Sequence, residues 1–193
     1  MNKSQLINSL KQEGFPKEIL NAFGKVPREN FISEEIREEA YDDKALLLEN
    51  GATISQPYTI AFMLDLLEIK PNQKILEIGS GCGYVLALIG ELSPNSEIYG
   101  IEILQSLAKK SKSLLSKYSN IKIINKNGHK GLSSHAPFDR ILISAAAGSL
   151  PKHLIDQLSP EGIIVAPVKN SIYKITRKEV KEFPGFVFVP LKK

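Results

Sequence analysis

The sequence has a single cysteine, Cys82, and no tryptophan. One cysteine cannot form an internal disulfide, so the cysteine content does not indicate an oxidising compartment. No apolar run approaches the roughly 18 residues of a membrane span, and the N-terminus has no apolar stretch long enough for export. The sequence therefore predicts a cytoplasmic protein that does not associate with a membrane.

The sequence also has little excess charge of either sign. Its net charge is +4, and the basic residues are interspersed with almost as many carboxylates. Such a distribution does not form the continuous basic surface that nucleic acid requires, so we expect no nucleic-acid partner. Three histidines and one cysteine show no ligand spacing, and we expect no metal site. A chain of 193 residues with 42% hydrophobic content predicts one domain, which we expect to be a monomer.

Apolar periodicity divides the chain into three parts. Residues 1–56 contain short helical patterns separated by Gly14 and Pro16, followed by a loop. Residues 57–168 begin with a helix over 58–67 and then alternate strand and helix patterns, which is typical of parallel strands joined by crossover helices. Residues 169–193 alternate at period two, which indicates antiparallel strands. The fold class is thus α/β, with a doubly wound, mostly parallel sheet, N-terminal helices and an antiparallel C-terminal addition. The predicted strands are 74–78, 97–101, 121–124, 139–144, 162–166, 172–177 and 185–191, and the predicted helices between them are 84–92, 104–118 and 151–158.

A glycine-rich loop follows the first of the predicted parallel strands. The motif is Glu77-Ile-Gly-Ser-Gly-Cys-Gly83, and a helical pattern begins directly after it. Ligands bind at the carboxyl edge of such sheets, where glycine allows the backbone to approach them closely. Glu102 lies at the end of the next strand, where a carboxylate can accept hydrogen bonds from both hydroxyls of a ribose. These features predict a nucleoside-containing ligand.

The spacing of the glycines distinguishes between ligands. A dinucleotide-binding loop has the form G-x-G-x-x-G, but here the third glycine, Gly83, comes one residue early and Tyr84 stands in the expected place. The Glu-x-Gly-x-Gly-x-Gly form resembles the first motif of class I S-adenosylmethionine-dependent methyltransferases. The alternative is that the glycines only form a tight turn between strand and helix.

Other blocks resemble one methyltransferase family, the protein-L-isoaspartate O-methyltransferases, in that family's order and over nearly the whole chain. The most diagnostic block is Thr53-Ile-Ser-Gln-Pro57, which other methyltransferases are not expected to have. The further blocks are Val26-Pro-Arg-Glu-Asn-Phe31, Ala40-Tyr41, Ala136-Pro-Phe-Asp-Arg-Ile141, Ser144-Ala-Ala-Ala147, Leu150-Pro151 and Phe188-Val-Pro-Leu191.

The resemblance implies a substrate and a reaction. The methyl group of S-adenosylmethionine passes to the α-carboxylate of L-isoaspartyl residues in damaged proteins and peptides. The resulting ester is displaced by the neighbouring backbone nitrogen, and hydrolysis of the succinimide returns some normal aspartate. A carboxylate with a reference pKa of about 4 is already ionised at neutral pH, so no general base is required. Accordingly, none of the three histidines is assigned to catalysis.

The resemblance also implies roles for particular residues. Ser55 matches the family's active-site serine, which orients the substrate carboxylate, although its position before a predicted helix also suits a helix cap. Thr53, Ile54, Ala145 and Ala146 are expected to contact the substrate. The expected cofactor-binding residues are Glu77, Gly79, Ser80, Gly81, Gly83, Glu102, Asn127 and Gly128.

The chain departs from the family's pattern at several positions. Asn127, with Lys126 before it, replaces the aspartate of a Gly-Asp-Gly motif that is expected to accept from the adenine amino group. Asparagine keeps a carbonyl acceptor but loses the charge. Ala52 replaces a glutamine, and Lys169 stands where glycine is usual. Two alternatives therefore accompany the repair hypothesis: a diverged methyltransferase with another carboxylate or small-molecule substrate, and a non-catalytic paralogue that binds proteins.

Overall fold

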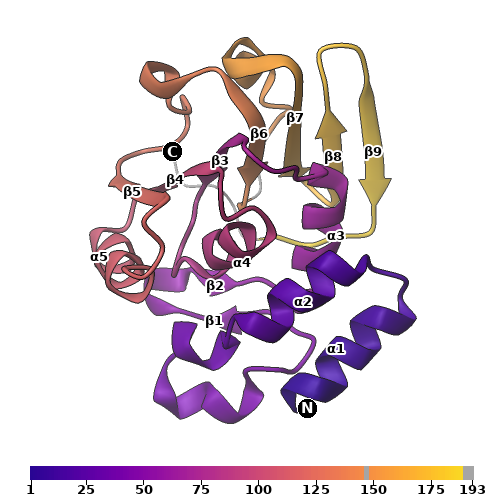
Figure 1. Ribbon diagram of the computed structural model, residues 1–193, viewed down its shortest axis with the longest axis vertical. Helices are drawn as coiled ribbons and strands as arrows, with labels where there is room; N and C mark the ends of the chain where they lie inside the picture. Colours follow the sequence, from indigo (N-terminus) through magenta and orange to yellow (C-terminus); the bar gives the residue numbers. More distant parts are fainter. Residues whose placement is uncertain (146–147, 189–193) are drawn as a thin grey trace.

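The computed structural model describes residues 1–145 and 148–188. Its centre is a seven-stranded sheet in the order β5-β4-β3-β6-β7-β8-β9 (Figure 1). The first five strands in this order are parallel, and β8 and β9 are antiparallel to their neighbours. The strands are β1 (Leu46–Leu47), β2 (Thr53–Ile54), β3 (Lys74–Ile78), β4 (Glu97–Glu102), β5 (Ile121–Asn125), β6 (Phe138–Ile143), β7 (Leu158–Val168), β8 (Ser171–Ile175) and β9 (Val180–Pro184).

The α-helices α3 (Pro57–Leu67) and α4 (Tyr84–Leu92) pack on one face of the sheet, whereas the other face packs against shorter segments. The other α-helices are α1 (Lys3–Gln12), α2 (Lys17–Lys25) and α5 (Gln105–Leu114), and the short 3₁₀ helices are η1 (Arg28–Phe31), η2 (Glu34–Glu39), η3 (Glu49–Gly51), η4 (Ser133–His135) and η5 (Lys152–Gln157). Buried side chains of α3 and α4 share one core with Ile75 of β3, whereas its neighbour Leu76 points into a second core with Leu132 and Leu154. The central strands are apolar on both faces, as a doubly wound sheet requires.

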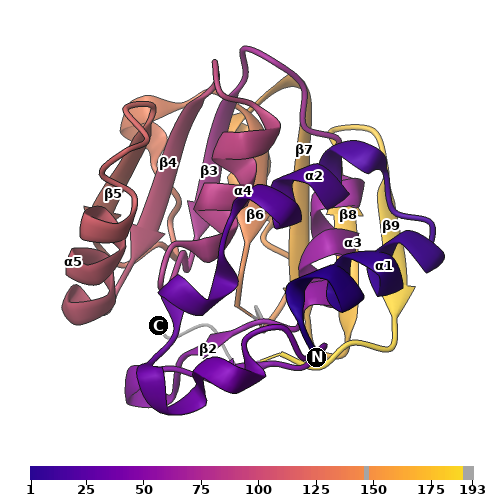
Figure 2. The same ribbon diagram turned by 60° about the horizontal axis from the view of Figure 1, so that its bottom comes forward.

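The N-terminal helices form an outer layer over α4. α1 packs on α2, and α2 crosses α4 (Figure 2). The chain then runs beneath the carboxyl ends of β3 and β4, where β1 and β2 form a small antiparallel hairpin. This hairpin carries the Thr53-Ile54-Ser55 segment to the edge of the sheet at which ligands of this architecture bind.

The predicted α/β class, the parallel strands and the antiparallel C-terminal addition are confirmed. Two predicted elements are wrong. The last strand is Val180–Pro184 rather than 185–191, because β8 and β9 pair through a turn at residues 176–179, and Gly185 through Phe188 leave the sheet; residues 189–191 lie outside the described part of the chain. The predicted helix 151–158 is the 3₁₀ helix Lys152–Gln157. Its buried residues Leu154 and Gln157 are three apart, a spacing that suits three residues per turn.

Candidate active site

The glycine loop connects β3 to α4 and is tied to the neighbouring strand. The N–H groups of Gly79 and Ser80 both donate to the carbonyl of Ile101, at 2.8 and 3.0 Å. Gly79, Gly81 and Gly83 all have positive φ. At Gly83, which heads α4, a Cβ would lie 2.9 Å from Cδ1 of Leu115, so both the backbone and the packing require glycine there.

Glu102 joins this loop to the next crossover helix. One carboxylate oxygen accepts the N–H of Gly81 and the other accepts the N–H of Leu104, both at 2.8 Å. The amide of Asn125 on β5 donates to the carbonyls of Glu102 and Ile103 and holds this turn from the other side. Each carboxylate oxygen retains a second lone pair, so Glu102 can still accept from a diol in the cavity beside it.

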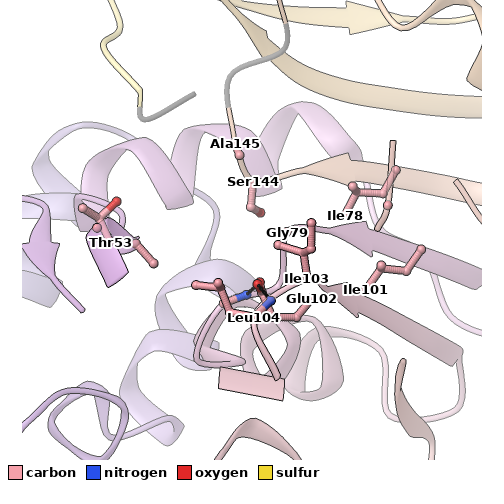
Figure 3. Close-up of a pocket in the computed structure, with 13 residues that line it drawn as sticks. Thr53, Ile78, Gly79, Ile101, Glu102, Ile103, Leu104, Ser144 and Ala145 are labelled. Atoms are coloured by element: carbon pink, nitrogen blue, oxygen red, sulfur yellow. Dashed lines mark hydrogen bonds between the residues drawn. The ribbon is translucent and has the colours of Figure 1, made fainter. Parts of the chain in front are cut away.

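A cavity of about 310 Å³, here called the main cavity, lies where the strand order reverses between β3 and β6. Figure 3 shows Ser144 and Ala145 directly after the end of β6, in the region between Thr53 and Gly79. The main cavity is lined by Gly51, Ala52, Thr53, Ile78, Gly79, Gly81, Ile101, Glu102, Ile103, Leu104, Gly128, Ser144 and Ala145. It thus combines apolar walls, a glycine backbone and one carboxylate.

A second hollow of about 270 Å³, here called the side pocket, lies on the other side of Thr53 and Ser144. It is lined by Ala45, Thr53, Ser55, Gln56, Thr59, Ser144, Val187 and Phe188. A gap of about 30 Å³, bordered by Ser55, Gly79 and Ser144 among others, lies between the two. Thr53 and Ser144 line all three spaces, so a group in the side pocket can meet a group in the main cavity there.

The backbone of Ser55 is held by a buried arginine. Arg28 has no exposed surface, and its Nη2 donates to the carbonyl of Ser55 at 2.9 Å. The guanidinium lies over the ring of Tyr84 in α4, 5.1 Å from the ring centroid, so α4 and the Ser55 segment are linked through it. Burial lowers the pKa of Arg28 from its ordinary value.

The suggestion that Ser55 caps a helix is wrong. Helix α3 begins at Pro57 with Gln56 at its N-cap, and the Gln56 side chain accepts from the Thr59 hydroxyl but from no backbone N–H of the first turn. The N–H of Tyr58 donates instead to the carboxylate of Asp43, at 2.8 Å, and the Gln56 amide donates to the same carboxylate. Asp43 therefore takes the capping function, and the hydroxyl of Ser55 is left for the side pocket.

Glu77 lies beneath the junction of the two spaces. Its side chain is almost fully buried, and Ser144 Oγ lies 2.6 Å from Oε1 of Glu77. The other oxygen, Oε2, has no hydrogen-bond partner in the described part of the chain. Burial raises the pKa of Glu77 to about 8, with a smaller contribution from the charge of Glu102 and an opposing one from Ser144. The carboxyl group is therefore mostly protonated at neutral pH.

The structure places the remaining predicted site residues as follows. Gly128 lines the main cavity, whereas Asn127 is exposed and its Oδ1 accepts the N–H of His129 at 2.9 Å. Ser80 and the buried Ile54 border the gap, and Ala145 lines the main cavity. Ala146 lies outside the described residues.

Sequence reasoning gave no individual role to Ser144, Arg28 or Asp43. Ser144 had a usable signal, because it directly follows β6 and the carboxyl ends of parallel strands converge. Arg28 and Asp43 are brought to the site only by the path of the N-terminal segment. Cys82 is buried, and burial raises the pKa of its thiol to about 11, so it is not a reactive thiolate.

The strand order, the glycine loop at the switch point and the carboxylate of Glu102 together define a class I methyltransferase fold and site. The chain matches the protein-L-isoaspartate(D-aspartate) O-methyltransferase family over residues 1–192. It belongs to that family, which confirms the family, the enzyme class and the S-adenosylmethionine cofactor predicted from the sequence.

Individual relatives agree with this assignment. The chain is 40% identical to the protein-L-isoaspartate O-methyltransferase of Christiangramia forsetii, over 98% of this chain and 93% of that protein. It is 37% identical to that of Methanothrix thermoacetophila, over 99% and 95%. A Plasmodium falciparum protein of this family, solved in complex with S-adenosyl-L-homocysteine, superimposes with a TM-score of 0.84 at 27% identity over 100% of this chain and 99% of that one. Another solved protein-L-isoaspartate O-methyltransferase shares the fold, with a TM-score of 0.89 at 20% identity, and this chain spans 66% of its length.

Proposed function

We propose that this chain transfers a methyl group from S-adenosylmethionine to the α-carboxylate of L-isoaspartyl residues in proteins and peptides. The observation that carries the proposal is the junction of the main cavity with the side pocket at Thr53 and Ser144. A methyl donor in the first and a carboxylate in the second meet at this junction, as methyl transfer requires.

The residues of the main cavity fit the cofactor. Glu102 offers a carboxylate to the ribose hydroxyls, and Ile78, Ile101 and Leu104 supply apolar walls for the base. The backbone of Gly79 and Gly81 borders the end nearest the side pocket and can approach the methionine moiety. When bound, S-adenosylmethionine supplies an electrophilic methyl group on a sulfonium centre.

The side pocket holds the acceptor. Ser55 orients the substrate carboxylate through its hydroxyl, Thr53 lines the pocket beside it, and Ile54 borders the adjoining gap. Ala145 follows β6 and offers backbone groups to the substrate peptide. Because the acceptor is already an anion, these residues only need to align it with the donor, which is a proximity effect.

Asn127 occupies the position expected to recognise adenine. Its Oδ1 already accepts one N–H, from His129, and retains one lone pair for the adenine amino group. We infer that it contributes less than a carboxylate in the same place. Gly128 packs tightly against the wall of the main cavity, since a Cβ there would lie 2.6 Å from Cγ2 of Ile78.

We infer further that the enzyme acts as a cytoplasmic monomer on protein and peptide substrates, and not on nucleic acid. The interspersed charges and the single buried cysteine support this inference. Among the residues that the structure describes, no helix is both long and apolar enough to cross a bilayer.

The experiment that tests this function uses a matched pair of peptides, one with L-isoaspartate and one with normal aspartate at the same position. The purified protein is incubated with each peptide and labelled S-adenosylmethionine. We expect base-labile methyl incorporation into the isoaspartyl peptide only. Cofactor binding without methylation of either peptide would instead indicate another methyl acceptor, and absence of both would indicate a protein-binding paralogue.

Two substitutions separate the roles of the two spaces. Ser55→Ala should lower kcat/KM for the isoaspartyl peptide by about 10-fold, the effect of one hydrogen bond to a charged group, with little change in S-adenosylhomocysteine affinity. Ser134→Ala is the matched control and should leave both quantities unchanged, because Ser134 is exposed in η4, which lies beside the start of β3 and not at the carboxyl edge of the sheet. An unchanged rate for Ser55→Ala would remove its proposed role.

A further inference from the structure

Ser144 occupies a position that the reaction proposed above leaves unused. It borders the main cavity, the side pocket and the gap between them, as only Thr53 does among the described residues. Its hydroxyl therefore lies at the junction where donor and acceptor meet, and Figure 3 shows it extending from the end of β6 toward that space. Ser55 borders the side pocket and the gap as well, but it comes from the N-terminal hairpin.

The direction of the hydrogen bond between Ser144 and Glu77 decides what this hydroxyl can do. The two oxygens are 2.6 Å apart. If Glu77 is ionised, Ser144 must donate to it, and the serine presents only lone pairs to the junction, which repel a carboxylate. If Glu77 is protonated, it can donate to Ser144, and the serine O–H is then available to the substrate.

The surroundings of Glu77 favour the protonated form. Its side chain is 1% exposed, and its Oε2 has no partner in the part of the chain described, so no donor there compensates a charge on that oxygen. The titratable groups around it are Glu102 on β4 and the thiol of Cys82 in the glycine loop; a negative charge on either opposes a second negative charge at Glu77. Its partners in register on the neighbouring strands, Gly100 and Leu142, carry no charge.

We propose that Ser144 is a second substrate-binding hydroxyl, which donates to the acceptor carboxylate from the side opposite Ser55, and that the Glu77 carboxyl group is the positioning residue that turns it toward the substrate. The proposal rests on the proposed methyl transfer to a carboxylate. Two hydroxyls from different elements hold both oxygens of the acceptor, and a neutral Glu77 places no negative charge beside it. Glu77 thereby has a function at the acceptor side of the site as well as beneath the glycine loop.

The test measures S-adenosylhomocysteine release against pH between 6.5 and 9.5, with an isoaspartyl peptide that has blocked termini and no group titrating in that range. For the parent enzyme, kcat/KM for the peptide should fall as the pH rises above about 8, since ionised Glu77 reverses the bond to Ser144. Ser144→Ala should lower kcat/KM at pH 7 by about 10-fold and lose the alkaline limb, with S-adenosylhomocysteine affinity within about 2-fold of the parent. Ser144→Thr, which keeps the hydroxyl, should recover most of the rate.

Glu77→Gln distinguishes positioning from a purely structural role. The glutamine amide can donate to Ser144 at any pH, so the alkaline limb should disappear while the dependence on Ser144 remains. A parent without methyl transfer to the isoaspartyl peptide refutes the proposed function itself. An active parent whose rate is unaffected by Ser144→Ala, or an alkaline limb that persists in Glu77→Gln, overturns the present inference alone.

Discussion

Replacement of Glu102 by glutamine tests the most closely connected part of the site. Both oxygens of this carboxylate accept backbone N–H groups at 2.8 Å, one from the glycine loop and one from the start of α5. Glutamine has a single oxygen, so its NH₂ group must face one of these donors. One charge-assisted bond is lost and a buried N–H is left without an acceptor, which costs about 2–4 kcal/mol in the free energy of unfolding.

The same substitution should weaken cofactor binding. Since one of the two acceptors for the ribose hydroxyls is replaced by a donor, we expect the Kd for S-adenosylhomocysteine to rise by about 10- to 100-fold. Urea unfolding without ligand and calorimetric titration of the folded protein measure the two effects separately. Glu102→Gln should show both a large loss of stability and a large rise in Kd, because the same side chain holds the glycine loop and binds the ribose.

The matched control is Glu97→Gln, at the other end of the same strand. The Glu97 side chain is 42% exposed and pairs with lysines at the surface, so its replacement should change stability by less than about 1 kcal/mol and leave the Kd unchanged. If Glu102→Gln were as stable as this control, the carboxylate would not hold the glycine loop. A normal Kd would refute its role toward the ribose.

Five further substitutions test other parts of the structure. Gly83→Ala should destabilise the fold by about 2–4 kcal/mol in urea unfolding, because backbone strain at φ +88° adds to a 2.9 Å contact between the new Cβ and Leu115. Gly81→Ala should cost only about 1–2 kcal/mol, because Gly81 has φ +54° but open space around it. Lys169→Gly should stabilise the protein by about 0.5–1 kcal/mol, since Lys169 has φ +54° in the β7–β8 turn, a conformation that glycine adopts without strain; a loss of stability would contradict this. Arg28→Met should lower kcat/KM for the isoaspartyl peptide by about 10-fold through loss of the bond to the Ser55 carbonyl. It should leave stability nearly unchanged, because Nε and Nη1 of this guanidinium are already buried without a hydrogen-bond partner among the described residues. Folding raises the pKa of Glu77 from its ordinary 4.5 to about 8. The stability that this group contributes is therefore complete below pH 4.5 and is lost as the pH rises to about 8. In Glu77→Gln, the free energy of unfolding should no longer show this decline between pH 4.5 and 8.

The glycine loop and the carboxylate of Glu102 could be predicted because they are local features of the sequence. Each lies directly after a strand, and the carboxyl ends of adjacent parallel strands must meet at one edge of the sheet. The predicted strand 185–191 failed for the converse reason. Residues 185–191 alternate at period two, but β8 pairs in register with residues 180–184, and this pairing leaves residues 185–188 outside the sheet.

By itself, the sequence determined the α/β class, the cofactor loop and the family, because these depend on strand patterns and motifs that are continuous along the chain. Only the tertiary structure decided how the acceptor side is built. Arg28 and Asp43 come from the N-terminal segment and Ser144 from the end of β6, more than 100 residues away from Arg28, and no local pattern relates them. The protonation state of Glu77 also depends on the tertiary structure. Its carboxyl group has an ordinary pKa until folding removes it from water and places Ser144 next to it.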